Sequence, residues 1–201
     1  RAENLLADAR AMMARFVGQN TPDYASTMIG QGELAMVRGD LQGADQSYAE
    51  AQRIFSQTVG DSHPYTLLAR LGRATAGSAS NDADQLQTAH EALSSLIVEL
   101  RASGPVAKSF LAQALCERSV VGQRIGVDAA LQDARDCLDI RQSLSLGGWR
   151  LHEAEALVLL HRGQRQALLE VLDRLDDEMS ANHPRLRWLQ AQAECCIDEN
   201  V

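Results

Sequence analysis

Val17-Gly18-Gln19-Asn20-Thr21-Pro22 is followed 42 residues later by Val59-Gly60-Asp61-Ser62-His63-Pro64, and the segments after the two stretches align without a gap. Self-similarity with a period of about 20 to 50 residues is typical of solenoid proteins, in which one small structural unit is stacked repeatedly. Proline closes both stretches, and it is favoured in the first turn of a helix, where its missing N–H needs no partner. We therefore expect a helix to begin at the same point of each repeat.

The later helix of each aligned repeat carries an apolar stripe. Its residues are spaced three or four apart, as on one face of a helix. Small residues in the earlier helix let the two helices approach closely, and a glycine between them can take the left-handed conformation that ends a helix. By this pattern, the residues with a packing role are Gly32, Gly39, Ala44, Tyr48, Ala51, Phe55, Leu86, His90 and Leu93.

The rest of the chain follows the same pattern more loosely and predicts an all-α fold. Further units begin near Gly104 and Gly147, and no alternating β-branched run indicates a strand. We expect an α–α superhelix, a solenoid of antiparallel helix hairpins, as one domain over residues 1–201. The units are about 17–58, 59–101, 102–145 and 146–181, with terminal helices at 2–16 and 184–198. The ten expected helices are at about 2–16, 22–38, 41–57, 64–78, 83–101, 105–124, 128–144, 149–162, 165–179 and 184–198.

The spacing of Gly32, Gly39, Ala44, Tyr48 and Ala51 resembles the small and aromatic positions of tetratricopeptide repeats. The 42-residue period and the Val-Gly-x-x-His/Thr-Pro linker are similar to the longer variant found in kinesin light chains and in many bacterial signalling proteins. The resemblance covers nearly the whole chain and is closest over residues 17–101. It implies a bacterial multidomain protein. The first helix has no partner before it, so we expect the chain to be a fragment of a larger protein.

Composition and cysteine placement narrow the possible partners. A formal net charge of -8 argues against nucleic acid, whose phosphates need a basic surface. No apolar run reaches the roughly 18 residues of a membrane span, so we expect no membrane insertion and a cytoplasmic location. The four cysteines lie within helical patterns without metal-ligand spacing, and we expect buried free thiols with no metal site. These cysteines are Cys116, Cys137, Cys195 and Cys196.

The expected function is binding rather than catalysis. The sequence contains no nucleophile elbow, phosphate loop or assignable acid–base pair, so we predict no enzyme, no cofactor and a protein or peptide partner. Stacked hairpins leave a concave groove lined by the first helix of each pair. The candidate groove residues, which could equally be solvated faces, are Ser26, Glu33, Met36, Thr75, Arg150 and Glu153.

Two functional hypotheses follow from such a groove, and a third is weaker. The first is a protein-interaction scaffold within a larger regulatory or signalling protein. The alternative is a sensor domain that binds a peptide or small molecule and controls an attached kinase or transcription-factor domain. An enzyme with a helical fold would need a convergent polar pocket, which the linear sequence does not display.

Overall fold

A computed structural model describes residues 2–145, 147–179 and 183–195. These residues form ten α-helices and no strand, so the predicted all-α class is confirmed. The chain divides into two compact units, Arg1–Phe110 and Leu111–Val201, and their boundary in the sequence falls inside α6 (Lys108–Ile125). Among the described residues, no helix is both long and apolar enough to cross a membrane. A single domain over residues 1–201 stays a prediction.

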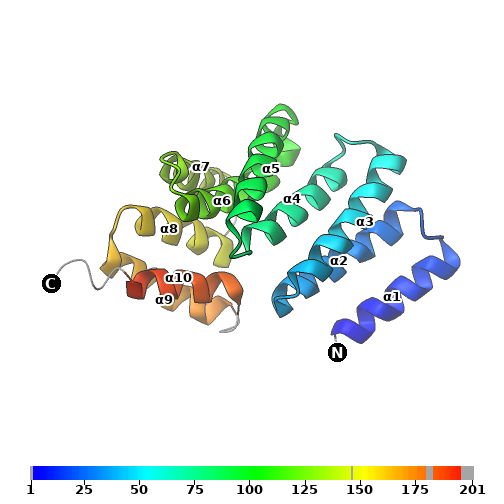
Figure 1. Cartoon of the computed structure of the whole chain (residues 1–201), viewed down its shortest axis with the longest axis horizontal. Coiled ribbons are helices and arrows are strands. Elements are labelled where there is room, and N and C mark those ends of the chain that lie inside the picture. The colour runs from blue at the N-terminus through cyan, green and yellow to red at the C-terminus, as the bar shows by residue number, and fades with distance from the viewer. Residues whose placement is uncertain (1, 146, 180–182, 196–201) are drawn as a thin grey trace. The chain divides into compact units, whose positions relative to one another are not determined.

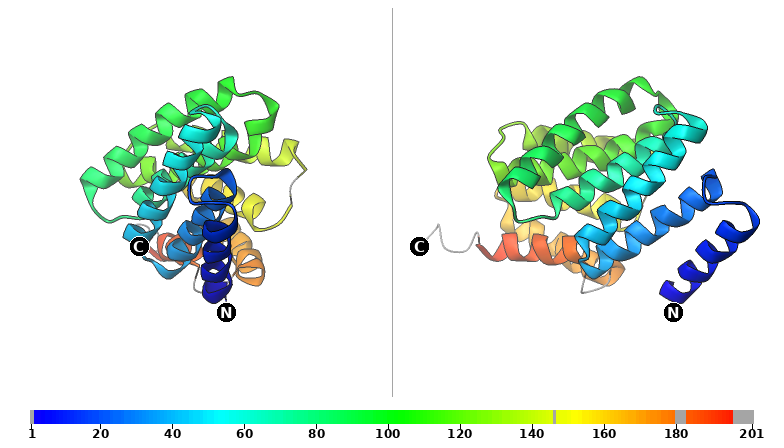
Figure 2. Two further views of the ribbon diagram at one scale, coloured as in Figure 1. Left: turned by 90° about the vertical axis from the view of Figure 1, so that its right-hand side faces the viewer. Right: turned by 45° about the vertical axis from the view of Figure 1, so that its right-hand side comes forward.

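The first unit is a series of antiparallel helices. Each helix packs against the next in the chain, and neighbouring helices run in opposite directions (Figures 1 and 2). The second and fourth helices also contact each other, as expected when one hairpin stacks on the next. The helices are α1 (Ala2–Phe16), α2 (Pro22–Arg38), α3 (Leu41–Val59), α4 (Pro64–Ser78) and α5 (Ala83–Ala102).

Local capping explains where these helices begin and end. Thr21 Oγ1 accepts the Tyr24 N–H at 3.4 Å, and Asp40 Oδ1 accepts the Gly43 N–H at 2.9 Å, which satisfies donors that a helix start leaves open. Pro22 occupies the first turn of α2. Gly39 ends that helix with φ 75°, the left-handed conformation expected from the sequence.

Tyr48 of α3 joins two successive hairpins. A Cβ atom built on Gly32 of α2 would lie 2.7 Å from the Tyr48 ring, and one on Gly72 of α4 would lie 2.5 Å from it. The ring therefore fills the space that two glycines leave open on opposite neighbours. One repeat earlier, Leu6 takes the place of Tyr48, and a Cβ on Gly30 would lie 3.1 Å from its Cδ2 atom.

Most of the residues assigned a packing role are buried. The apolar side chains on the stripe of α3 and α5 are buried in the core, and Gly32 is buried beside them. His90 is half-buried, and Gly39 serves as the end of α2 rather than as a core residue. The buried members are Gly32, Ala44, Tyr48, Ala51, Phe55, Leu86 and Leu93.

The part of the chain after α5 repeats the hairpin arrangement with two shifts at helix starts. Pro105–Ala107 form a short 3₁₀ turn before α6, where the sequence predicted the helix itself. The next helix begins at Ala130 instead of 128, because residues 128–129 form a turn. The remaining helices, each packed on the next, are α7 (Ala130–Ser143), α8 (Trp149–His161), α9 (Arg165–Glu178) and α10 (Pro184–Cys195).

The expectation of four buried free thiols is wrong. Cys116 of α6 and Cys137 of α7 form a disulfide, because the turn between these helices brings their Cα atoms to 5.6 Å, within the range that a disulfide spans. Cys195 is a free thiol, as expected, but it is exposed. Cys196 lies outside the described residues.

Candidate binding groove

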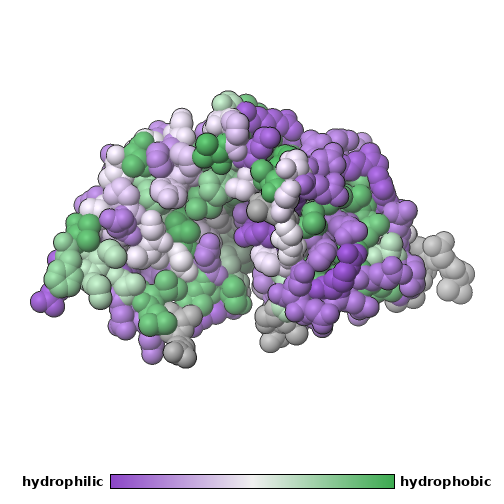
Figure 3. Space-filling model, turned by 180° about the vertical axis from the view of Figure 1, so that it is seen from behind, coloured by the Kyte–Doolittle hydropathy of each residue, from purple (hydrophilic) through white to green (hydrophobic). Residues whose placement is uncertain are grey.

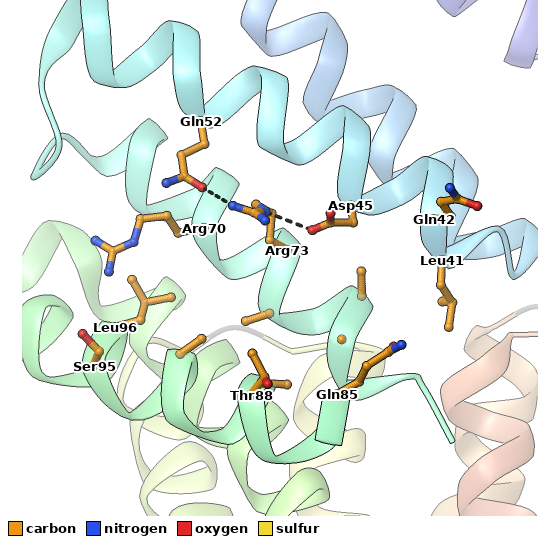
Figure 4. A pocket seen from close by; sticks show the side chains of 15 residues that line it. Leu41, Gln42, Asp45, Gln52, Arg70, Arg73, Gln85, Thr88, Ser95 and Leu96 are labelled. Carbon is orange, nitrogen blue, oxygen red and sulfur yellow. Dashed lines mark hydrogen bonds and ion pairs between the residues drawn. The ribbon is translucent and has the colours of Figure 1, made fainter. Parts of the chain in front are cut away.

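A groove of about 860 Å³ lies between α3 and α5 in the first unit (Figure 4). Both helices pack on α4, so a hollow is left between them with α4 at its base. Small residues form part of the lining: Ala74 and Gly77 of α4 and Ala89 of α5. A Cβ on Gly77 would lie 3.2 Å from the Ala89 Cβ, so α4 and α5 approach closely at this point.

Two arginines of α4 tie its base to the two walls. Arg73 donates from Nε to Asp45 Oδ1 at 2.9 Å and from Nη1 to Gln52 Oε1 at 3.2 Å, both on α3 (Figure 4). Arg70 donates two hydrogen bonds to Glu99 of α5, at 2.6 and 2.7 Å. The Arg70 hydrogen bonds lower the pKa of the Glu99 carboxyl below its ordinary value. The guanidinium groups are thus oriented before any ligand arrives.

The walls of the groove offer hydrogen bonds of both kinds. Carboxamide and hydroxyl side chains project from α3 and α5, and each amide carries a donor and an acceptor. The Arg73–Asp45 pair is partly exposed, and an exposed pair contributes about 0–1 kcal/mol. A ligand group can therefore replace a partner of Arg73 at small cost. The amide and hydroxyl residues are Gln42, Gln52, Gln85, Thr88 and Ser95.

The candidate residues of the first unit lie outside this groove. Ser26 and Glu33 are exposed on α2, while Met36 packs against the core at half exposure. Thr75 lies on α4, but its Oγ1 is buried and has no hydrogen-bond partner among the described residues. The sequence pattern identified first helices correctly, yet the hollow opens between the second helices α3 and α5.

The two candidates of the second unit have different environments. Arg150 is exposed on α8, with its guanidinium carbon 4.6 Å from the centre of the Trp149 ring. Glu153 is only 5% exposed. Its carboxylate forms an ion pair with Arg185, in which Glu153 Oε1 lies 3.1 Å from Arg185 Nε. Burial raises the pKa of the Glu153 carboxyl. The expectation that Glu153 lies on an open face is wrong, because α10 covers it with a partner of opposite charge.

The second unit holds buried polar contacts that the sequence analysis missed. Arg185 also reaches Glu117 of α6 at 2.5 Å, so one guanidinium joins α10 to two buried carboxylates. Ser119 Oγ and His161 Nε2 are 2.8 Å apart, and burial lowers the pKa of that histidine. Ser119 is fully buried and cannot meet a substrate, so this pair joins α6 to α8. Ser119 and His161 are 42 residues apart, which is one repeat period, and this spacing is the sequence signal that could have predicted their contact.

No family model matches the chain, and no curated protein matches it in sequence. The resemblance to tetratricopeptide repeats therefore rests on the spacing of the repeat residues themselves. A function has to be argued from the groove and its lining.

Proposed function

We propose that this chain is a protein-interaction module, part of a larger regulatory or signalling protein, that holds a partner segment in the groove between α3 and α5. The groove lining is the observation that carries the proposal: amide and hydroxyl groups stand on the two walls, and the base carries two guanidinium groups beside small residues. The resemblance of the repeat to tetratricopeptide repeats, which bind peptides and proteins, supports it. The groove on the first helices, expected from the sequence, is not needed for this proposal.

An extended peptide is the partner shape that suits this lining. Its backbone presents an N–H and a C=O at each residue, spaced about 3.3 Å apart along the strand, and these groups need partners when water is displaced. Gln42 and Gln52 on one wall and Gln85 on the other can each donate and accept. Alanine and glycine at the base leave room for a peptide backbone to approach.

The proposal is tested by filling the groove. Ala92 is an exposed helical alanine that lines the groove, and Ala191 is an exposed helical alanine of α10 that does not. Peptides are first selected from a random display library against the whole chain, and their affinities are then measured by fluorescence anisotropy. We expect Ala92→Trp to abolish binding, Arg73→Gln to weaken it and Ala191→Trp to leave it unchanged. Binding that ignores both groove variants would refute this site.

The size of the groove also favours the sensor hypothesis as a second candidate. Pockets that hold small molecules are commonly about 300–1,000 Å³, and this groove has about 860 Å³. A thermal-shift screen of a metabolite library against the wild type and Ala92→Trp distinguishes the sensor hypothesis from the protein-interaction hypothesis. A metabolite that stabilises the wild type alone, in the absence of any peptide binder, would favour a sensor that controls an attached kinase or transcription-factor domain.

The disulfide bears on the location of the protein. Disulfides persist in oxidising compartments and are rare in the reducing cytoplasm. The Cys116–Cys137 bond therefore favours an oxidising compartment over the cytoplasmic location expected from the sequence. Alkylation of free thiols in the intact source cells, followed by mass spectrometry, tests this choice. Full alkylation of Cys116 and Cys137 without reductant would restore the cytoplasmic hypothesis.

A further inference from the structure

Arg141 of α7 is one of the few charged side chains in the interior. Figure 3 shows wide hydrophilic areas on the surface, where most of the charged residues lie. Arg141 is 4% exposed, and its Nη2 atom has no hydrogen-bond partner among the described residues. Its Nε atom donates to Cys137 Sγ at 3.4 Å, one helical turn earlier. A buried charge is costly unless an anion contacts it, so the environment of this guanidinium is unusual.

Two buried carboxylates act on Arg141 only from a distance. Glu117 of α6 and Glu153 of α8 attract its positive charge, but within the described ranges neither forms a hydrogen bond or ion pair with it. Both carboxylates pair with Arg185 of α10 instead. Burial lowers the pKa of the Arg141 guanidinium, as expected for a charge that lacks a contacting anion.

The other charged groups on the helices around Cys137 do not supply that anion. Asp133 lies one turn before Cys137 on α7, and its two oxygens accept hydrogen bonds from Arg118 of α6 at 2.8 and 2.7 Å. Arg150 of α8 adds another positive charge nearby. In the part of the chain that the structure describes, the Cys137 sulfur is the one atom that accepts a hydrogen bond from the Arg141 side chain.

Reduction of the disulfide supplies the missing anion. A disulfide sulfur is neutral and accepts hydrogen bonds only weakly. A free cysteine can lose its proton, and an adjacent guanidinium lowers the pKa of the thiol. The Cys137 thiolate would then form an ion pair with Arg141, which the oxidised chain does not have. No guanidinium among the described residues donates to Cys116.

We propose that Cys116 and Cys137 form a redox-active pair, in which Arg141 holds Cys137 as a thiolate once a dithiol has reduced the bond. A thiolate of the dithiol attacks the Cys116 sulfur, the S–S bond breaks, and its electron pair leaves on Cys137, the better leaving group. The second thiol of the reductant then displaces Cys116 from the mixed disulfide. Cys116 takes up one proton, the other proton of the dithiol goes to solvent, and the dithiol is oxidised to a disulfide.

Burial controls the rate of this exchange but not its equilibrium. Cys116 and Cys137 are 2% and 0% exposed, so a dithiol reaches the bond only when the hairpin of α6 and α7 opens locally. The equilibrium depends on the free energies of the oxidised and reduced chains. Stabilising the reduced chain makes a disulfide a stronger oxidant, and the ion pair between Arg141 and the thiolate acts in this direction.

Equilibration of the whole chain with dithiothreitol tests the proposal. The chain is incubated at neutral pH in mixtures of reduced and oxidised dithiothreitol and quenched with acid. Its free thiols are then alkylated and counted by mass spectrometry. Arg141→Met should shift the equilibrium about tenfold toward the disulfide, because the thiolate loses its counterion. Arg141→Lys retains a positive charge and should keep part of the wild-type behaviour.

Arg135→Met is the matched control. Arg135 is a half-buried arginine of the same helix, and its Nε atom has no hydrogen-bond partner among the described residues. This variant should equilibrate as the wild type does. Arg141→Met removes a buried charge that no anion contacts, so its melting temperature in the oxidised form should not fall. That measurement separates loss of the thiolate ion pair from loss of the fold.

The thiolate is measured directly in the reduced chain. Cys116→Ser and Cys137→Ser each leave one thiol of the pair once the other two cysteines are also changed to serine, and ultraviolet absorbance follows its ionisation with pH. Cys137 should ionise at a lower pH than Cys116, and Arg141→Met should remove the difference. Equal ionisation of the two thiols would overturn the proposal. So would a dithiothreitol equilibrium that Arg141→Met leaves unchanged, or a chain that forms no Cys116–Cys137 bond in oxidised dithiothreitol.

Discussion

Gly72→Ala should destabilise the first unit even though alanine is the better helix former. The added Cβ would lie 2.5 Å from Tyr48 Cε1, whereas carbon atoms pack at about 3.5–4.0 Å, so the ring must retreat by about 1 Å. Overpacking of this kind costs about 1–3 kcal/mol, and replacing a helical glycine offsets about 0.5–1 kcal/mol. We therefore expect a net loss of about 1 kcal/mol.

Gly30→Ala provides the matched comparison. Its new Cβ would meet only Leu6 Cδ2 at 3.1 Å, the end of a flexible side chain that moves by a few tenths of an ångström. The stability gained by replacing a helical glycine with alanine should then outweigh the cost of this contact. The variant should be more stable than the wild type by about 0.5 kcal/mol. The two substitutions are chemically identical and both fall within a helix, so the difference of about 1–2 kcal/mol isolates the Tyr48 ring.

Urea unfolding followed by circular dichroism measures these differences. Repeating Gly72→Ala in a Tyr48→Ala background removes all the ring atoms that the new methyl group would meet. The cost should then disappear, giving a coupling free energy of about 1–2 kcal/mol between the two positions. Equal effects of Gly72→Ala in both backgrounds, or equal stabilisation by Gly72→Ala and Gly30→Ala, would refute the reasoning.

Three further predictions concern the second unit. The cysteines of the Cys116–Cys137 disulfide are 21 residues apart, and its reduction should lower the free energy of unfolding by about 3 kcal/mol and lower the melting temperature. The control variant Cys195→Ser, which removes the free thiol, should show the same response to reductant. Burial lowers the pKa of His161 below 6.5, so the unfolded state binds the proton more readily. Its contribution to stability is therefore full above about pH 6.5 and is lost as the pH falls through the folded value. Urea midpoints measured from about pH 8 to pH 5 should fall less steeply in His161→Gln than in the wild type. Arg185→Met removes the guanidinium that pairs with two buried carboxylates, Glu117 and Glu153, and should cost about 3–5 kcal/mol in urea unfolding. The exposed control Arg187→Met should change the stability little, and equal costs would contradict the buried cluster.

The parts of the fold that depend on local sequence were predictable. Capping residues, first-turn prolines and Gly39 mark helix ends within a few residues of where they occur, so most helix bounds agree with the structure. The core stripe of Tyr48 and Phe55 also follows from periodicity, because helical spacing alone decides which face is apolar. Packing between adjacent repeats follows from the same stripe once the 42-residue offset is known.

The parts that depend on contacts between distant helices were not predictable in this way. Glu153 looks like a solvated residue until Arg185, 32 positions later, is known to lie beside it. Cys116 and Cys137 pair only because one turn sets the register of two helices. The groove depends on which helices remain unpacked against each other, and the sequence periodicity does not contain that information.

The glycine–ring contacts of Tyr48 also constrain how such an array can lengthen during evolution. The ring sits against Gly32 of its own hairpin and Gly72 of the next, so the contact spans the boundary between repeats. An inserted segment of 42 residues contains one copy of every repeat position, whichever residue it starts from. It therefore supplies a new ring and new glycines at the correct spacing. An insertion of another length within one of these helices would separate the ring from a glycine, whereas growth by whole periods leaves every existing contact of this kind intact.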